Sequence, residues 1–303
     1  MKYLRLFRLK STIIYVFPFV LALSVGLEQT RPGRQVASVA PYAWYTVLFA
    51  YLAYFCGSFF SSTLNFYADV PADRVHDGLY KDQDISRQPF ATGEMGPMET
   101  VVLFAGLGAG CVFFSFMVNI RFAFFMLGAV LLLGILYSHP WFRFKEKPVL
   151  DIVTNATGAV LILFAGMAVV SKDNPPFIPI LFGWVFSATM YMPSVANDVP
   201  FDAEAGYRTS GVVFGQRNLV LAMIPMAAVL VGVGIWGVLA GSINWQYRLF
   251  IGLGFPAAVV ATSMVLLTYD PPHIKLNPLI FVFPLLGLDL FYLALGLYYL
   301  TKL

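Results

Sequence analysis

The sequence predicts an all-α integral membrane protein, and three observations lead to this fold class. Hydrophobic residues make up 59% of the 303 positions, charged residues only 12%, and the mean hydropathy is +0.76. The 29 Phe and 16 Tyr residues cannot all be hidden inside a water-soluble globule of this length. Apolar runs recur along the chain, each with roughly the 20 residues that a helix needs to cross a bilayer.

Nine of these runs are long enough to predict transmembrane helices. The third and fourth runs meet at Asn119 to Arg121 with almost no connection between them. We expect one integral-membrane domain over residues 1–303, with two pseudo-related halves of about 1–137 and 138–303. The approximate limits of the runs are 11 to 27, 41 to 68, 98 to 120, 121 to 137, 149 to 170, 176 to 196, 217 to 241, 247 to 267 and 277 to 299.

Lysine and arginine are unevenly distributed between the two sides of this arrangement. The side of the amino terminus carries 13 of the 19 basic residues, and the opposite side carries 6. By the positive-inside rule, the first side is cytoplasmic. The same side carries 13 of the 16 acidic residues, although acids contribute little to topology. This concentration of carboxylates needs its own explanation, and a polyanion held through metal ions is one.

The first acidic motif closes the second predicted helix. Asn65, Asp69 and Asp73 follow one another at four-residue intervals. Residues four apart lie on one face of a helix, so these oxygen-bearing side chains would form one stripe. Pro71 is expected to end or bend the helix, which would leave Asp73 and Asp77 on less regular backbone.

The second acidic motif closes the sixth predicted helix. Asp198 and Asp202 repeat the four-residue spacing, and Pro200 follows Asp198 by two residues. Both motifs close even-numbered helices, so both must emerge on the same side of the membrane. Asp and Asn oxygens suit hard cations such as Mg²⁺, which commonly shares its shell with phosphate. One motif alone would be equally compatible with solvated loop charges, whereas two matching motifs favour a metal site.

These motifs resemble those of the UbiA superfamily of intramembrane prenyltransferases. The family has an Asn-Asp-x-x-Asp-x-x-x-Asp motif after the second helix, which Asn65, Asp69 and Asp73 match. Its second motif, Asp-x-x-x-Asp after the sixth helix, is matched by Asp198 and Asp202. The nine-helix count agrees as well, so the resemblance covers essentially the whole chain and implies a helical bundle around a central cavity.

Other segments extend the resemblance, and several positions depart from it, among them the inserted Gln88 and Leu9 in place of a common Pro. Phe66 replaces the Asp that usually follows the motif Asn, and Ser194 stands where many members have another Asp. The number of bound metal ions is therefore left open. The further matching residues are Arg87 with Pro89, Thr92 and Gly93, Tyr137 and Ser138 with Arg143 and Lys145, and Gly206 with Arg208 and Thr209.

The resemblance implies a Mg²⁺-dependent enzyme that ionises an isoprenyl pyrophosphate and transfers the prenyl group to a lipophilic acceptor, an aromatic ring or a lipid. It implies no nucleic-acid partner, and it leaves the oligomeric state open. The implied metal ligands are Asn65, Asp69, Asp73, Asp198 and Asp202, of which the four Asp are also the implied catalytic residues. The implied substrate-binding residues are Arg87, Tyr137, Arg143, Lys145 and Arg208.

Four more residues are supporting candidates. Asp289 lies inside the ninth predicted helix, where an acid is costly in hydrocarbon. Such an acid either lines a functional cavity or is protonated or hydrogen-bonded to a neighbouring helix. Arg8 and Lys10 are candidates for binding the acceptor, and Asp77 for supporting the first motif.

Two other classes of protein are compatible with these residues. A transporter or channel for an anion or Mg²⁺ also places acids and broken helices in the membrane. A lipid-binding scaffold would tolerate neutralisation of the acids. Turnover of a prenyl donor separates the enzyme from both alternatives.

Overall fold

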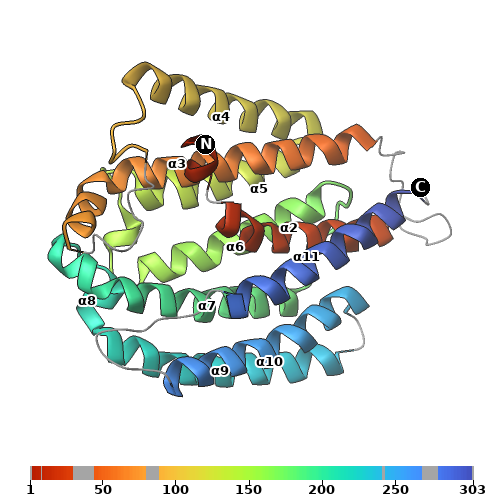
Figure 1. The fold of residues 1–303 in the computed structure, drawn as a ribbon. Helices are drawn as coiled ribbons and strands as arrows, with labels where there is room; N and C mark the ends of the chain where they lie inside the picture. Colours follow the sequence, from red (N-terminus) through yellow and green to blue (C-terminus); the bar gives the residue numbers. More distant parts are fainter. Residues whose placement is uncertain are drawn as a thin grey trace.

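The computed structural model describes residues 2–7, 9–29, 44–79, 89–240, 243–267 and 279–301. Within these ranges every regular element is helical, and the long helices lie side by side in one bundle (Figure 1). Their bounds are α1 Lys2–Leu6, α2 Leu9–Gln29, α3 Trp44–Leu79, α4 Pro97–Val118, α5 Ile120–Val130, the π-helical turn η1 Leu131–Leu136, the 3₁₀ turn η2 Phe144–Glu146, α6 Leu150–Ala168, α7 Phe177–Glu204, α8 Ser210–Phe214, α9 Gln216–Leu239, α10 Trp245–Leu267 and α11 Leu279–Leu300.

Six of these helices, α3, α4, α6, α7, α9 and α10, are long and apolar enough to cross a membrane. Three shorter apolar segments lie at Val16–Gln29, Ile120–Leu136 and Leu286–Leu300. The predicted class of an all-helical integral membrane protein is confirmed, whereas the predicted count of nine transmembrane helices is not. Helices that are apolar on every side are buried in a protein core or in a membrane. Here α6 is mostly buried in the bundle, whereas few residues of α4 are buried.

The bundle is ordered around α6, the most buried of the six long helices. It packs against α2, α5 and α7, while α4 lies at the edge and contacts mainly α3 and α5 (Figure 1). Gly166 brings α6 directly onto the backbone of α2, because a side chain at this position would collide with the Phe19 carbonyl oxygen. Small residues allow such close approach of helices in membranes.

The short connection between the third and fourth predicted helices is confirmed. Asn119 adopts an extended conformation between α4 and α5, and its Oδ1 accepts a hydrogen bond of 2.8 Å from the Phe122 amide. Its Nδ2 donates to the Ala168 carbonyl oxygen at 2.9 Å, which ties the turn to the end of α6. Asn119 is therefore both an N-cap and a link between helices.

Pro71 is predicted to end or bend the second helix; the predicted end is wrong, and so is the less regular backbone predicted for Asp73 and Asp77. Helix α3 continues through Pro71 to Leu79, and α7 likewise continues through Pro200 to Glu204. A proline removes only one backbone donor, and membrane helices tolerate this loss when the freed carbonyl finds another partner. Both acidic motifs consequently lie on regular helix rather than on loops.

Candidate active site

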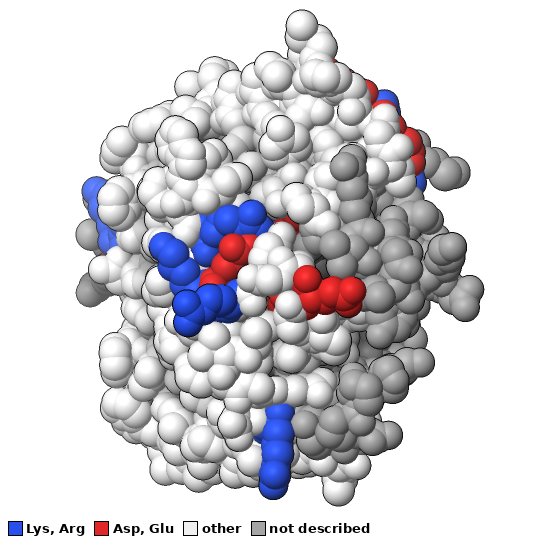
Figure 2. All heavy atoms as spheres, turned by 90° about the vertical axis from the view of Figure 1, so that its left-hand side faces the viewer, with Lys and Arg blue, Asp and Glu red and all other residues white. Residues whose placement is uncertain are grey.

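The carboxyl-terminal ends of α3 and α7 meet at one end of the bundle, together with η2 and α8 (left in Figure 1). This confirms that the two acidic motifs share one side. Figure 2 faces that end and shows positive and negative side chains gathered near its centre, within a mostly uncharged surface. The candidate site is therefore a charged patch at this end of the bundle (Figure 2).

Asp69 of the first motif forms an ion pair with Lys145 of η2. The Lys145 side chain is only 10% exposed, so this contact lies largely out of water. Burial lowers the pKa of the Lys145 ammonium, and the Asp69 carboxylate opposes this shift. A buried cation held by one carboxylate is well placed to bind the oxygens of an anionic ligand.

The segment that carries Lys145 has an unusual backbone. Arg143, at φ 40°, adopts the left-handed conformation, and its guanidinium forms an ion pair with Glu146. It also lies 4.9 Å from the centre of the Tyr207 ring. The Arg143 Nε is buried and has no hydrogen-bond acceptor among the described residues. An unmet guanidinium donor beside the Asp69 and Lys145 pair fits a site for an anion.

The second motif faces this segment from α7. Asp198 is exposed, whereas Asp202 is half-buried and accepts a hydrogen bond of 2.9 Å from the Thr209 hydroxyl. Asp202 lies within electrostatic reach of Asp69 and Lys145. Lys145 therefore contacts the first motif directly and acts electrostatically on the second, which offsets the repulsion between Asp69 and Asp202.

Asp151 is a residue of this site that the sequence reasoning did not single out. It is 1% exposed at the start of α6 and accepts hydrogen bonds from the Ser210 amide at 2.9 Å and the Ser210 hydroxyl at 2.5 Å. The Ser210 hydroxyl in turn accepts from the Val149 amide at 2.7 Å. Val149 has φ 71°, a strained value for a β-branched residue, which these contacts hold in place.

The Asp151–Ser210 network is connected to the second motif through the neighbouring residue Thr209. Ser210 directly follows Thr209, the residue that donates to Asp202. The available sequence signal was an acid at the beginning of the fifth predicted apolar run, but its partner is 59 positions away. Asp151 thus joins the basic segment before α6 to the segment after α7.

We expect Asp151→Ala to lower the apparent melting temperature of the purified protein. The substitution leaves buried amides of Ser210 and Ile152 without their acceptor, a loss of about 1–3 kcal/mol for each unpaired buried group. Ser24→Ala is a matched control, because that hydroxyl donates only to the Leu21 carbonyl of its own helix. Equal melting temperatures for the two variants in detergent would contradict the structural role of Asp151.

The other predicted residues are placed less completely. The Tyr137 hydroxyl is hydrogen-bonded to the Tyr191 hydroxyl of α7, and Arg208 is exposed between α7 and α8. Asn65 is half-buried one turn before Asp69 on α3. Only the helical backbone is described for Asp73, Asp77 and Lys10, and Arg8 and Arg87 lie outside the described residues.

Asp289 is buried in α11 and is 6% exposed. Neither of its carboxyl oxygens has a hydrogen-bond partner among the described residues, so the predicted bond to a neighbouring helix is not found there. It lies within electrostatic reach of Tyr51, which precedes Asp69 by 18 residues, or about 27 Å along α3. Asp289 therefore belongs to the interior of the bundle rather than to the charged patch.

The donor set of the two motifs fits Mg²⁺. Asn65 and Asp69 on α3, and Asp198 and Asp202 on α7, offer only oxygen atoms, which this cation prefers. Within the described part of the chain, no three His, Cys, Asp or Glu side chains are already arranged around a common point for a metal ion. Asp69 is held by Lys145 instead, so metal binding requires this carboxylate to be shared or released.

The fold and the site define a membrane-embedded helical bundle with two carboxylate motifs and a buried lysine at one end. The chain belongs to the UbiA prenyltransferase family, whose profile matches residues 33–298. The structure of a UbiA homologue from Archaeoglobus fulgidus bound to DMAPP and Mg²⁺ superposes with a TM-score of 0.86 and 26% identity, over 100% of both chains. The same homologue bound to GPP and Mg²⁺ gives 0.85 and 25%, over 99% of this chain and 100% of the other.

A lycopene elongase/hydratase from Haloferax volcanii is 38% identical over 143 residues. This match covers 44% of the present chain and 46% of the relative, which is about half of each length. A second lycopene elongase/hydratase, from Halobacterium salinarum, is 36% identical over 89 residues, which cover 29% of this chain and 32% of the relative.

Proposed function

We propose that this chain is a Mg²⁺-dependent intramembrane prenyltransferase. It ionises an isoprenyl pyrophosphate, transfers the prenyl group to a lipophilic acceptor and releases pyrophosphate. The observation that carries this proposal is the pair of carboxylate motifs on the contacting helices α3 and α7, with the buried Lys145 ion-paired to Asp69 and within electrostatic reach of Asp202. The full-length similarity to a UbiA homologue bound to DMAPP and Mg²⁺ supports the same donor class and metal.

In this proposal the two acidic motifs and the nearby basic residues have different roles at the pyrophosphate. The side-chain oxygens on α3 and α7 hold the cation, which when bound offsets the charge that grows on the departing pyrophosphate. Lys145 and Arg143 bind the remaining phosphate oxygens, with Arg87 and Arg208 as further donors. The metal ligands in this proposal are Asn65, Asp69, Asp73, Asp198 and Asp202.

The allylic cation needs a dry environment that tolerates positive charge. Tyr191 lies seven residues before Asp198 on α7, two helical turns or about 10 Å deeper in the bundle. Its hydroxyl bonds to that of Tyr137, so two aromatic rings are held together just inside the charged patch. Aromatic faces stabilise nearby cations, and this pair is the proposed wall of the reaction centre.

An apolar polyene is the acceptor that the relatives support best, because two of them are lycopene elongase/hydratases. Such an acceptor would extend into the interior of the bundle, where Asp289 is a proposed lining residue. Arg8 and Lys10 are proposed contacts at the acceptor entrance, and Asp77 is a proposed support of the first motif.

The same proposal includes an arrangement in the membrane. The six long helices and the three shorter apolar segments together give nine crossings in a single domain. The amino terminus and both acidic motifs then face the cytoplasm, where the basic residues are concentrated. The two motifs occupy corresponding places in two pseudo-related halves, about 1–137 and 138–303.

We expect the purified full chain to form prenylated products only with Mg²⁺ present. The assay combines DMAPP, GPP and longer prenyl pyrophosphates with polyene, quinone-ring and glycerol phosphate acceptors, and identifies the products by mass. Chelation with EDTA should abolish pyrophosphate release, and added Mg²⁺ should restore it. If the protein instead moves Mg²⁺ or an anion across liposome membranes and shows no prenyl turnover, it is a transporter and the enzyme proposal is wrong.

A further inference from the structure

The amino-terminal helix α1 is fastened to the rest of the protein by a buried apolar contact. Leu6 is fully buried in a cluster with Phe90 and Met95. Phe66 and Val70 of α3 pack against the same cluster. The residue after α1 adds a second contact to α3, because the Phe7 ring stacks on the Phe59 ring with centroids 4.1 Å apart.

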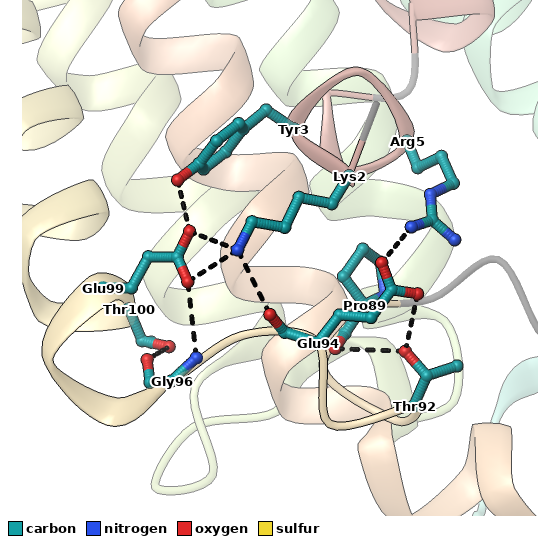
Figure 3. Close-up of polar contacts among 9 residues, drawn as sticks. All are labelled: Lys2, Tyr3, Arg5, Pro89, Thr92, Glu94, Gly96, Glu99 and Thr100. Atoms are coloured by element: carbon teal, nitrogen blue, oxygen red, sulfur yellow. Dashed lines mark hydrogen bonds and ion pairs between the residues drawn. The ribbon is translucent and has the colours of Figure 1, made fainter.

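A rim of charged contacts surrounds this apolar centre (Figure 3). Lys2 Nζ lies 2.6 Å from Glu99 Oε1 and donates to the Glu94 carbonyl oxygen at 3.2 Å. Tyr3 donates to the Glu99 carboxylate, and Arg5 forms an ion pair with Glu94. The Arg5 guanidinium lowers the pKa of Glu94, so this pair stays charged at neutral pH and is lost only in acid.

We name this assembly the amino-terminal clasp; it comprises α1, the turn at residues 89–96 and the first turn of α4. Its apolar side packs on one stripe of α3, which is formed by Phe59, Phe66 and Val70. Their spacings of seven and four residues place them on one helix face. The stripe of the first motif, Asn65 and Asp69, precedes Phe66 and Val70 by one position each. Fixing one stripe of a helix therefore fixes the direction in which the neighbouring stripe points.

We infer that the clasp is a positioning device for the first acidic motif. It holds the rotation of α3 at the point where Asp69 must face Lys145 and the second motif. Phe66 stands where the resembling motif has an Asp, and here its ring packs on the clasp. In this chain Phe66, next to Asn65, thus helps to orient the carboxylates of the first motif through apolar packing. This inference rests on the proposed function.

The test is a charge exchange between Arg5 and Glu94. Arg5→Glu and Glu94→Arg each replace an attractive pair by a repulsive one, and the double variant restores attraction with the signs reversed. We expect each single variant to raise the KM for the prenyl pyrophosphate and the Mg²⁺ concentration for half-maximal rate by about threefold, with little change in kcat. The double variant should return both values toward those of the unsubstituted protein.

A second measurement tests how firmly the clasp holds α3 and does not depend on enzyme turnover. Hydrogen exchange of the α3 amides around residues 59–70 should accelerate in each single variant and recover in the double variant. Lys172→Glu, an exposed charge reversal between α6 and α7, is the matched control and should change neither reading.

The two proposals fail in distinguishable ways. If the unsubstituted protein turns over no prenyl donor, the proposed function fails, while the exchange measurement still decides whether the clasp holds α3. If turnover is present but the single variants leave KM and amide exchange unchanged, the proposed positioning role of the clasp is contradicted. The inference also fails if the double variant does not restore KM and amide exchange. In that case each substitution acts through its own charge and not through the Arg5–Glu94 ion pair.

Discussion

Asp69→Ala and Asp198→Ala are each expected to reduce prenyl transfer by about two to three orders of magnitude in kcat, the loss typical of removing one electrostatic contact to a transition state. Asp69 on α3 is ion-paired with the buried Lys145, and Asp198 is an exposed acid on α7. In the proposed metal site, each substitution removes oxygen ligands for Mg²⁺ and leaves the charge on the departing pyrophosphate less well compensated.

The measurement is Mg²⁺-dependent pyrophosphate release from a prenyl donor, together with the melting temperature of each variant. Glu204→Gln is the matched control, because Glu204 is an exposed acid at the same end of α7 that lies outside the proposed metal site. The control should retain full activity. Normal pyrophosphate release in both alanine variants would remove the catalytic assignment of the two motifs.

The location of both acidic motifs at one end of the bundle could be predicted because membrane topology is a strong constraint. Helices that cross a bilayer alternate in direction, so two motifs that close even-numbered helices must meet at one side, and α3 and α7 do meet there. Four-residue spacing likewise predicts a shared helix face, since it depends only on helical geometry. Neither inference required knowledge of how the helices pack.

The parts that were missed depend on contacts between distant segments. Whether a helix survives Pro71 depends on the surroundings of a single freed carbonyl, which local sequence does not reveal. Arg143 and Lys145 look equivalent in the sequence, yet only Lys145 reaches Asp69, because the left-handed turn at Arg143 redirects the chain between them. The partner of Asp151 lies on a segment beyond α7.

Lys145→Met is expected to separate phosphate binding from metal binding. The substitution keeps an apolar side chain of similar length in the buried position but removes the ammonium that pairs with Asp69 and acts electrostatically on Asp202. We expect the KM for the prenyl pyrophosphate to rise by about 10- to 100-fold, as for the loss of one hydrogen bond to a charged group. The Mg²⁺ concentration for half-maximal rate should fall, because Asp69 loses the cation that competes with the metal.

Lys147→Met is the matched control for this substitution. Lys147 lies two residues further on and is exposed, with its ammonium 5.2 Å from the centre of the Phe144 ring rather than on an acid of either motif. It should leave both constants unchanged. A purely structural role for Lys145 predicts that both constants rise together with a lower melting temperature, since the half-buried Asp69 carboxylate would lose its partner. Opposite movements of the two constants in a stable protein can arise only if Lys145 contacts the pyrophosphate and competes with the metal for Asp69.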